Sequence, residues 1–296
     1  MKIGTVAQHA NIGPTGKSWY KNDLTKNVVP GRLNDYNIIG WWDFSDTRNL
    51  TTFTGNNVFL CLDKGPYDAH LTPDSTLKGP TLTHEGQDGY SYANFSNTVF
   101  DSMRFKNPID IKARNFTFTV VIDMNVTTLT SDMTFFQING DNNGKMFFMW
   151  DDYGSFDRLW LQREMTGQTS RYAYGSNMSE YFSQPIGGDQ QYNFNWFTVV
   201  CNNDGYAAAY VRGKKITFAN SGAFADVTFS KDSASYIMDA RNIDTGETTS
   251  TGDAMSANVY EVMMFDQALE HQDLHQIDMY IKNKYKSYKY GRVNGQ

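Results

Sequence analysis

Two histidines, His271 and His275, stand four residues apart in the segment LEHQDLHQIDMYIKNKYKSY, residues 269–288. Residues four apart share one face of a helix, so two imidazoles in this arrangement could ligate one zinc ion. A zinc protease of this type also needs a glutamate directly after the first histidine to act as the base. That position holds Gln272, which cannot take a proton at neutral pH. The sequence therefore favours an ordinary closing helix over a zinc site.

A second set of residues has the composition of a sugar-binding surface. Alternation along a strand in DRLWLQRE puts Leu159 and Leu161 on one face, so Trp160 lies on the other. Aromatic rings beside Arg and Gln suit a pyranose, which offers C–H groups to stack and hydroxyl groups to hydrogen-bond. The alternative is that these aromatic side chains belong to the core or to an oligomer interface. The candidate ligand patch consists of Arg158, Trp160, Gln162, Tyr172 and Tyr174.

These side chains need a sheet to display them, and the chain from about residue 38 to residue 265 has the character of strands. Short apolar or alternating runs are separated there by Gly, Asn and Asp. In NFTFTVVIDMNV the alternation puts Phe116, Phe118 and Val120 on one face and Thr117 and Thr119 on the other. Many strands with short turns predict an antiparallel sandwich.

The segment that holds the two histidines is the one convincing helix of the sequence. Apolar residues recur at spacings of three and four and form one stripe, which needs a sheet to cover. His271 and His275 fall beside this stripe, toward solvent. The residues of the stripe are Leu274, Ile277, Tyr280, Ile281 and Tyr285.

Residues 1–37 differ from the rest, because Gly and Pro are scattered among Asn, Lys and Thr and no period holds for long. We expect an extended N-terminal arm that docks on a partner, and its aromatic pair Trp19 and Tyr20 suits such an interface.

Composition narrows the classes of partner. The chain of 296 residues carries 26 basic and 32 acidic residues, a net charge of −6, so it offers no positive field for nucleic acid. No segment has the apolar core of a signal peptide or the length of a membrane span, and we expect synthesis in a cytoplasm.

Two cysteines, Cys61 and Cys201, stand 140 positions apart in apolar surroundings, so we expect buried free thiols.

The order of segments resembles the laminin-G-like branch of the concanavalin A-like lectin/glucanase superfamily, over about residues 40 to 286. The similarity begins with WWDFSDTRNLTT and LCLDKGPYDAHLT and ends with ANVYEVMMFDQALEHQDLHQIDMYIKNKY. The resemblance implies an all-β jelly-roll sandwich of two antiparallel sheets, closed by the C-terminal amphipathic helix. It places the sandwich at residues 38–288, between the arm and a short tail at 289–296.

The glycosidases of this superfamily carry paired carboxylates on one strand, which act as acid and as nucleophile or base. We find no such strand, because Asp110, Asp123 and Glu261 each stand alone. We expect these three to be turn or edge residues with local hydrogen bonds. A Gly-x-Ser-x-Gly elbow is absent from the sequence as well. The sequence therefore predicts a protein that is not an enzyme.

Laminin-G-like domains often bind calcium at a rim, and the resemblance makes calcium the one cofactor to consider. The candidate ligands are Asp141, Asp151 and Asp152, in segments that we expect to be loops. Ordinary turn chemistry is the alternative explanation for these residues.

Two functions remain open. In the first, the protein is a noncatalytic virion component, similar to phage head decorations, fibre heads or tail adhesins. Its arm would dock on other particle proteins and its lectin-like domain would bind host surface glycans. Under this hypothesis we expect a homo-oligomer on a virion surface. In the second, it is a free carbohydrate-binding protein or a carbohydrate-processing module.

Overall fold

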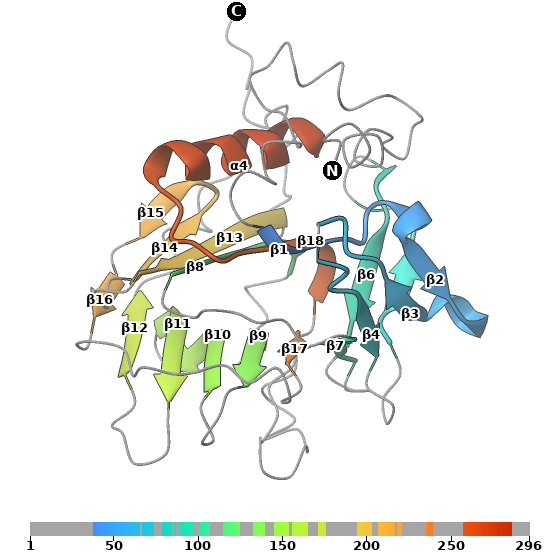
Figure 1. Ribbon diagram of the computed structural model, residues 1–296, viewed down its shortest axis with the longest axis horizontal. Coiled ribbons are helices and arrows are strands. Elements are labelled where there is room, and N and C mark those ends of the chain that lie inside the picture. The colour runs from blue at the N-terminus through green and yellow to red at the C-terminus, as the bar shows by residue number, and fades with distance from the viewer. Residues whose placement is uncertain are drawn as a thin grey trace, which may run out of the picture.

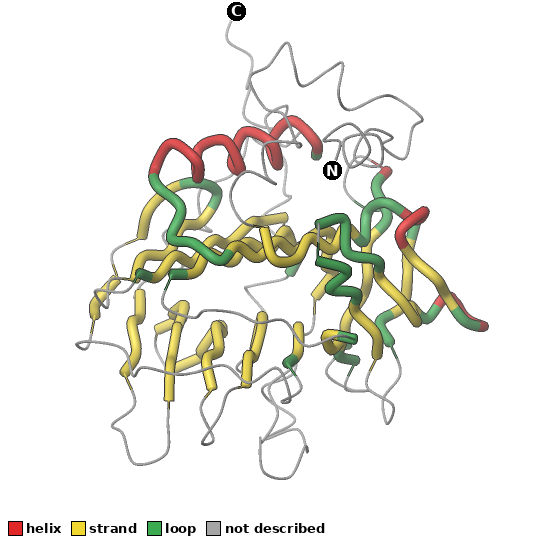
Figure 2. Tube along the Cα trace, in the orientation of Figure 1, coloured by secondary structure: helices red, strands yellow, loops and turns green. Residues whose placement is uncertain are grey.

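The computed structural model describes residues 38–65, 67–73, 79–84, 86, 89–96, 101–106, 115–124, 133–139, 145–153, 156–164, 171–175, 194–202, 207–216, 218–220, 235–238 and 257–285. The expected arm and its Trp19 and Tyr20 lie outside these residues, as does the tail at 289–296. Two antiparallel β-sheets and one helix make up the described part, so the expected all-β sandwich is confirmed (Figures 1 and 2). None of the described helices is long and apolar enough to cross a membrane.

The first sheet has eight strands in the order β15-β14-β13-β8-β18-β6-β5, with β1 also paired to β18. Its strands are β1 (Ile38–Asp43), β5 (Thr81–Thr83), β6 (Tyr92–Phe95), β8 (Phe116–Asp123), β13 (Phe194–Cys201), β14 (Ala207–Val211), β15 (Lys214–Ile216) and β18 (Ala257–Phe265).

The second sheet has ten strands in the order β16-β12-β11-β10-β9-β17-β7-β4-β3-β2. Its strands are β2 (Leu50–Thr52), β3 (Val58–Cys61), β4 (Leu71–Pro73), β7 (Met103–Phe105), β9 (Met133–Asn139), β10 (Lys145–Tyr153), β11 (Phe156–Glu164), β12 (Arg171–Gly175), β16 (Phe218–Asn220) and β17 (Tyr236–Ile237).

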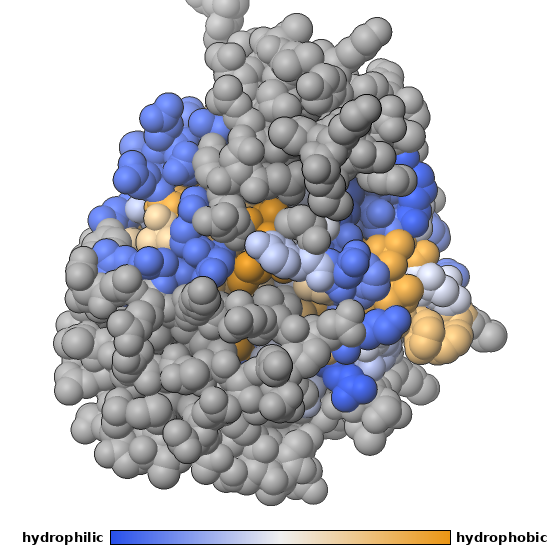
Figure 3. Space-filling view, in the orientation of Figure 1, coloured by the Kyte–Doolittle hydropathy of each residue, from blue (hydrophilic) through white to orange (hydrophobic). Residues whose placement is uncertain are grey.

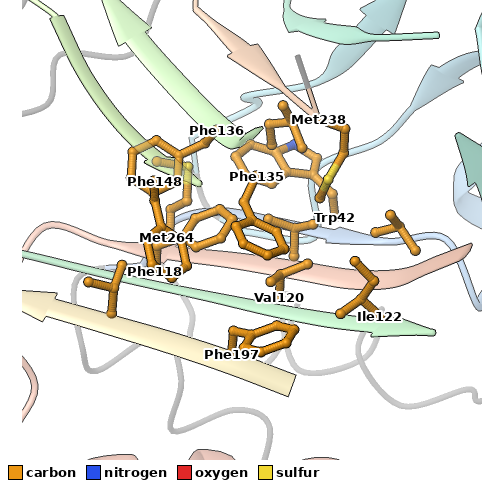
Figure 4. Packing of buried hydrophobic residues seen from close by; sticks show 14 of the residues in the cluster. Trp42, Phe118, Val120, Ile122, Phe135, Phe136, Phe148, Phe197, Met238 and Met264 are labelled. Atoms are coloured by element: carbon orange, nitrogen blue, oxygen red, sulfur yellow. The ribbon is translucent and has the colours of Figure 1, made fainter. Parts of the chain in front are cut away.

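The main core lies between the two sheets and is rich in aromatic side chains (Figure 4). The alternation read in β8 is confirmed, because Phe118, Val120 and Ile122 point into this core. Phe118 packs against Phe136 of β9, with ring centroids 4.5 Å apart. Cys61 and Cys201 are buried free thiols, as expected. The sandwich is therefore held together by the inward faces of its strands.

Helix α4 (His271–Lys284) covers the outer face of the eight-stranded sheet (Figure 1). All five residues of the predicted stripe are buried, and they form a second apolar cluster with side chains of β1, β13 and β18. Strand β18 serves both layers: Val262 and Met264 face the main core, while Met263 and Phe265 face α4. The described part of the molecule thus has three layers: α4, the eight-stranded sheet and the ten-stranded sheet. The outer face of the ten-stranded sheet lies on the side away from α4.

Candidate functional site

Trp160 and Gln162 lie on the outer face of the ten-stranded sheet, opposite to the layer that α4 covers. Leu159 and Leu161 of the same strand, β11, are fully buried in the core, which confirms the alternation read from the sequence. Trp160 and Gln162 are half-buried. The indole Nε1 of Trp160 donates a hydrogen bond to Oε1 of Gln162, at 2.9 Å. This bond fixes the orientation of the indole and leaves part of the ring in contact with solvent.

Strand β10 adds two apolar residues that the sequence analysis missed. In the ladder between β10 and β11, Met149 lies opposite Trp160, and Phe147 lies opposite Gln162. Both are half-buried, and the Lys145 ammonium group sits 5.5 Å from the centroid of the Phe147 ring. The signal was present in KMFFMW, because the alternate residues Met146, Phe148 and Trp150 are those that point inward. We call Phe147, Met149, Trp160 and Gln162 the aromatic face.

The polar side chains beside this face are supplied by β9. Gln137 lies opposite Phe147 and Asn139 lies opposite Lys145, so both share the outer face. Both are buried, and Nε2 of Gln137 donates to Oδ1 of Asn139 at 2.8 Å. The outer face therefore grades from buried amides on β9 to half-exposed apolar and aromatic side chains on β10 and β11.

The remaining residues of the candidate patch are placed by their backbone register. Tyr174 lies opposite Trp160, and Tyr172 lies opposite Gln162, in the ladder between β11 and β12. Arg158 lies opposite Asp151 in the ladder between β10 and β11. The side chains of Arg158, Tyr172 and Tyr174 lie outside the described part of the structure.

Two of the three candidate calcium ligands lie in a strand. Asp151 and Asp152 lie within β10 rather than in a turn, so that expectation was wrong. The segment reads as a loop because Asp is depleted in strands, but pairing with β11 overrides this preference. Asp141 and the side chains of Asp151 and Asp152 lie outside the described part. Where the structure is described, no three His, Cys, Asp or Glu residues gather as metal ligands, and His271 and His275 are exposed.

A buried ion network lies between β1, β18 and α4. The Lys284 ammonium group donates to Oδ2 of Asp43 at 2.7 Å and to Oε2 of Glu261 at 2.8 Å. Lys64 donates to the same Asp43 oxygen at 2.8 Å. Tyr280 and Tyr285 donate from their hydroxyl groups to Glu261, at 2.8 and 2.9 Å. Each of these four charged groups has a partner of opposite sign, and the two tyrosine hydroxyl groups add hydrogen bonds to Glu261.

The network shifts the pKa values of Asp43 and Lys284 in the direction of ionisation. Burial alone would raise the pKa of Asp43, but the charges of Lys284 and Lys64 outweigh it and hold that pKa well below its ordinary value of 3.8. Burial would lower the pKa of Lys284, but Asp43 and Glu261 together raise it above 10.5. Asp43 and Glu261 are almost completely buried, so this pair of carboxylates has no access to a substrate.

Glu261 corrects one expectation. It is not a turn or edge residue, because it lies inside β18 with no exposed surface and binds Tyr280 and Lys284 of α4 and Tyr285, which follows the helix. Asp123 ends β8 and is half-buried, and burial raises its pKa. Asp110 lies outside the described residues.

No protein-family model matches this chain, and no curated protein matches it. Solved structures do match it in shape. The binding domain of botulinum neurotoxin serotype D has a TM-score of 0.53 at 11% identity, covering 84% of this chain and 53% of that chain. A botulinum neurotoxin type C structure, described in terms of interaction with two ganglioside molecules, has a TM-score of 0.53 at 16% identity, covering 88% and 53%. The receptor-binding domain of the mosaic serotype C/D has a TM-score of 0.54 at 13% identity, covering 83% and 51%.

At these identities the likeness shows the fold. The chain spans about half the length of each of these neighbours. The shared architecture is the β-sandwich described above, in agreement with the all-β sandwich expected from the sequence.

Proposed function

We propose that this protein is a noncatalytic carbohydrate-recognition domain that binds glycans on a cell surface through the aromatic face of its ten-stranded sheet. The observation that carries the proposal is the half-exposed Trp160, held by its hydrogen bond to Gln162 and flanked on β10 by Met149. A pyranose ring would stack its C–H groups on the indole and on Phe147. The amide of Gln162 and the ammonium group of Lys145 would bind its hydroxyl groups.

Two further observations support a binding role. The buried carboxylates Asp43 and Glu261 are bound to Lys284 inside the protein, so they cannot serve as the acid and nucleophile of a glycosidase. The structural neighbours are named as binding domains, and one of them is described with gangliosides. Arg158, Tyr172 and Tyr174 would extend the face toward β12, where the register puts the two tyrosines opposite Gln162 and Trp160.

The wider setting that we propose is a virion surface. The protein would be a decoration, fibre or tail component, docked on other particle proteins by residues 1–37 and assembled as a homo-oligomer. The aromatic pair Trp19 and Tyr20, in the polar segment 1–37, supports this setting. Calcium at Asp141, Asp151 or Asp152 remains a proposal that metal analysis of the purified protein would test. The second candidate, a free carbohydrate-binding protein, shares the aromatic face and differs only in the role of the arm.

Glycan-array screening of the intact chain, followed by titration of the best ligand, tests the proposed face. We expect Trp160→Ala to weaken binding about tenfold or more, because one aromatic stacking contact is lost. Tyr67→Ala is the matched control, since Tyr67 is an exposed aromatic residue, 59% exposed, outside this face. Failure of the intact chain to bind any glycan, or equal binding by Trp160→Ala, would contradict the proposal.

Light scattering on the intact chain and on a variant lacking residues 1–37 separates the two settings. A particle component should be oligomeric and should lose assembly with the arm while its glycan binding remains. If both forms are monomeric, the result would favour the free binding protein.

A further inference from the structure

The turn between β2 and β3 carries two exposed phenylalanines at the end of the ten-stranded sheet. Among the described residues, the large hydrophobic side chains with high exposure are Phe53 at 60%, Phe59 at 42% and Tyr67 at 59%. The rings of Phe53 and Phe59 contact each other, with centroids 4.3 Å apart and planes at 39°. We call residues 53–59 the hairpin tip. Hydrophobic surface is visible at this end of the molecule in the space-filling view (Figure 3).

The local backbone holds both rings outside the core. Thr51 pairs with Leu60 and Thr52 pairs with Val58, so Phe59 is the extra residue of a β-bulge. Because of this bulge, Val58 and Cys61 both face the core while Phe59 stays outside. A bulge that re-aims a side chain is a feature of functional edges of sheets. The turn itself needs a left-handed residue at Asn56, with φ of 62°.

The hairpin tip has two properties that fit an apolar environment. The run from residue 49 to residue 62 contains no Asp, Glu, Lys, Arg or His, so insertion would desolvate no charge. The turn also satisfies backbone groups internally: the amide of Phe53 donates to the carbonyl oxygen of Asn57 at 2.8 Å, and the amide of Asn56 donates to the carbonyl oxygen of Phe53 at 3.1 Å. Backbone groups that are already paired lose little on leaving water.

We propose that the hairpin tip inserts Phe53 and Phe59 into the interfacial layer of an uncharged lipid bilayer. Phenylalanine and leucine side chains of interfacial segments bury in this layer of a membrane. A protein or glycan partner would need directed polar contacts for specificity, and the side-chain amide of Asn57 in the tip is already bound within the protein: the Thr81 hydroxyl group donates to Oδ1 of Asn57 at 3.3 Å. The proposal is independent of the aromatic face on β10 and β11, since it concerns the opposite end of the same sheet.

Co-sedimentation of the intact chain with phosphatidylcholine vesicles, at millimolar lipid, tests this insertion. Two phenylalanines alone give weak and reversible binding, so a high lipid concentration is needed. We expect the double variant Phe53→Ser with Phe59→Ser to lower the partition coefficient about tenfold or more. The double variant Phe53→Leu with Phe59→Leu should stay within about threefold of the intact chain, because insertion depends on apolar area rather than on aromaticity.

Three outcomes would overturn the proposal. They are no binding of the intact chain to these vesicles, equal loss in the serine and leucine variants, and stronger binding to anionic vesicles than to neutral ones. Equal loss would indicate an aromatic-specific partner such as a glycan or a protein pocket. The net charge of −6 predicts weaker binding to anionic vesicles. Glycan binding by the serine variant, measured in parallel, should be unchanged, so that failure of one proposal does not affect the other.

Discussion

Lys284 compensates two buried carboxylates with one ammonium group. Its side chain is 1% exposed and lies between Asp43 and Glu261, on two different strands. Removing one partner from a buried ion network leaves the remaining charge without compensation in a medium that solvates it poorly. The lysine therefore holds α4 to the sheet through electrostatics as well as through the apolar stripe.

We expect Lys284→Met to lower the free energy of unfolding by about 3–5 kcal/mol, since Asp43 and Glu261 would repel each other while buried. Urea denaturation at neutral pH measures this change. Lys282→Met is the matched control: Lys282 pairs with the buried Asp278 of the same helix, but the Lys282 side chain is itself 34% exposed. Its loss should cost about 1 kcal/mol or less. Equal effects of the two substitutions would show that burial of the network adds nothing to stability.

The residue-level predictions succeeded where a side chain follows strand alternation. They failed where a side chain binds a partner on another element of the fold. The exposure of Trp160 follows from its two buried neighbours, Leu159 and Leu161. Glu261 gave no such signal, because its partner Lys284 comes from a helix whose docking no local pattern specifies. A lone glutamate within the apolar run VYEVMMF was the only sign that an internal cation had to be present.

At the level of elements, α4 docks on the turn between β14 and β15 as well as on the sheet. Asp278 of α4 accepts a hydrogen bond from the indole of Trp196, at 3.0 Å. Gly213 of the turn lies beside the same carboxylate and has φ of +75°. The glycine is required there twice, for its left-handed backbone and for the close approach of the helix.

Gly213→Ala should lower the free energy of unfolding by about 2–4 kcal/mol, because left-handed strain adds to a clash. A Cβ at this position would lie 2.5 Å from Oδ1 of Asp278. Gly89→Ala is the control, since Gly89 has φ of +80° but open space around it. That change should cost about 1 kcal/mol from backbone strain alone. Thermal unfolding of both variants separates strain from crowding, and equal shifts would contradict the close approach.

The elements themselves were largely predictable, but their pairing was not. Alternation identified the strand near 116–123, and the stripe identified α4, because both periods are local properties of the chain. The order of strands in two large sheets depends on contacts between distant segments. The strand character of Asp151 and Asp152 was missed for this reason, since it comes from pairing with β11.

At the level of the whole molecule, the ion network couples stability in acid to the packing of α4 on the eight-stranded sheet. The pKa of Asp43 lies below that of an unfolded chain, so its contribution is present above about pH 4 and is lost as the pH falls through its folded pKa. The pKa of Asp46 shifts in the same direction: burial opposes the shift, and the hydrogen bond from Arg48 together with the charges of Lys64 and Arg48 outweighs it. Burial raises the pKa of Asp63 and acts in the opposite sense.

A comparison of two pH profiles isolates the contribution of Asp43 from these opposing groups. We expect the free energy of unfolding of the intact protein to fall more steeply between pH 6 and pH 3 than that of Asp43→Asn, which has no carboxylate to protonate at this site. The variant should also be less stable at neutral pH, because Lys64 and Lys284 lose a shared partner. Denaturant unfolding at several pH values gives both slopes. Parallel profiles would show that Asp43 has the same pKa in the folded and unfolded chain.

The separation of the network's members along the chain bears on the order of events during synthesis. Asp43 can meet Lys64 early, since 21 positions separate them, but Lys284 follows Asp43 by 241 positions. Until Lys284 leaves the ribosome, burying Glu261 would leave a carboxylate without its cation. The outer layer must therefore form late, and β1 stays without its partners β18 and α4 for most of translation.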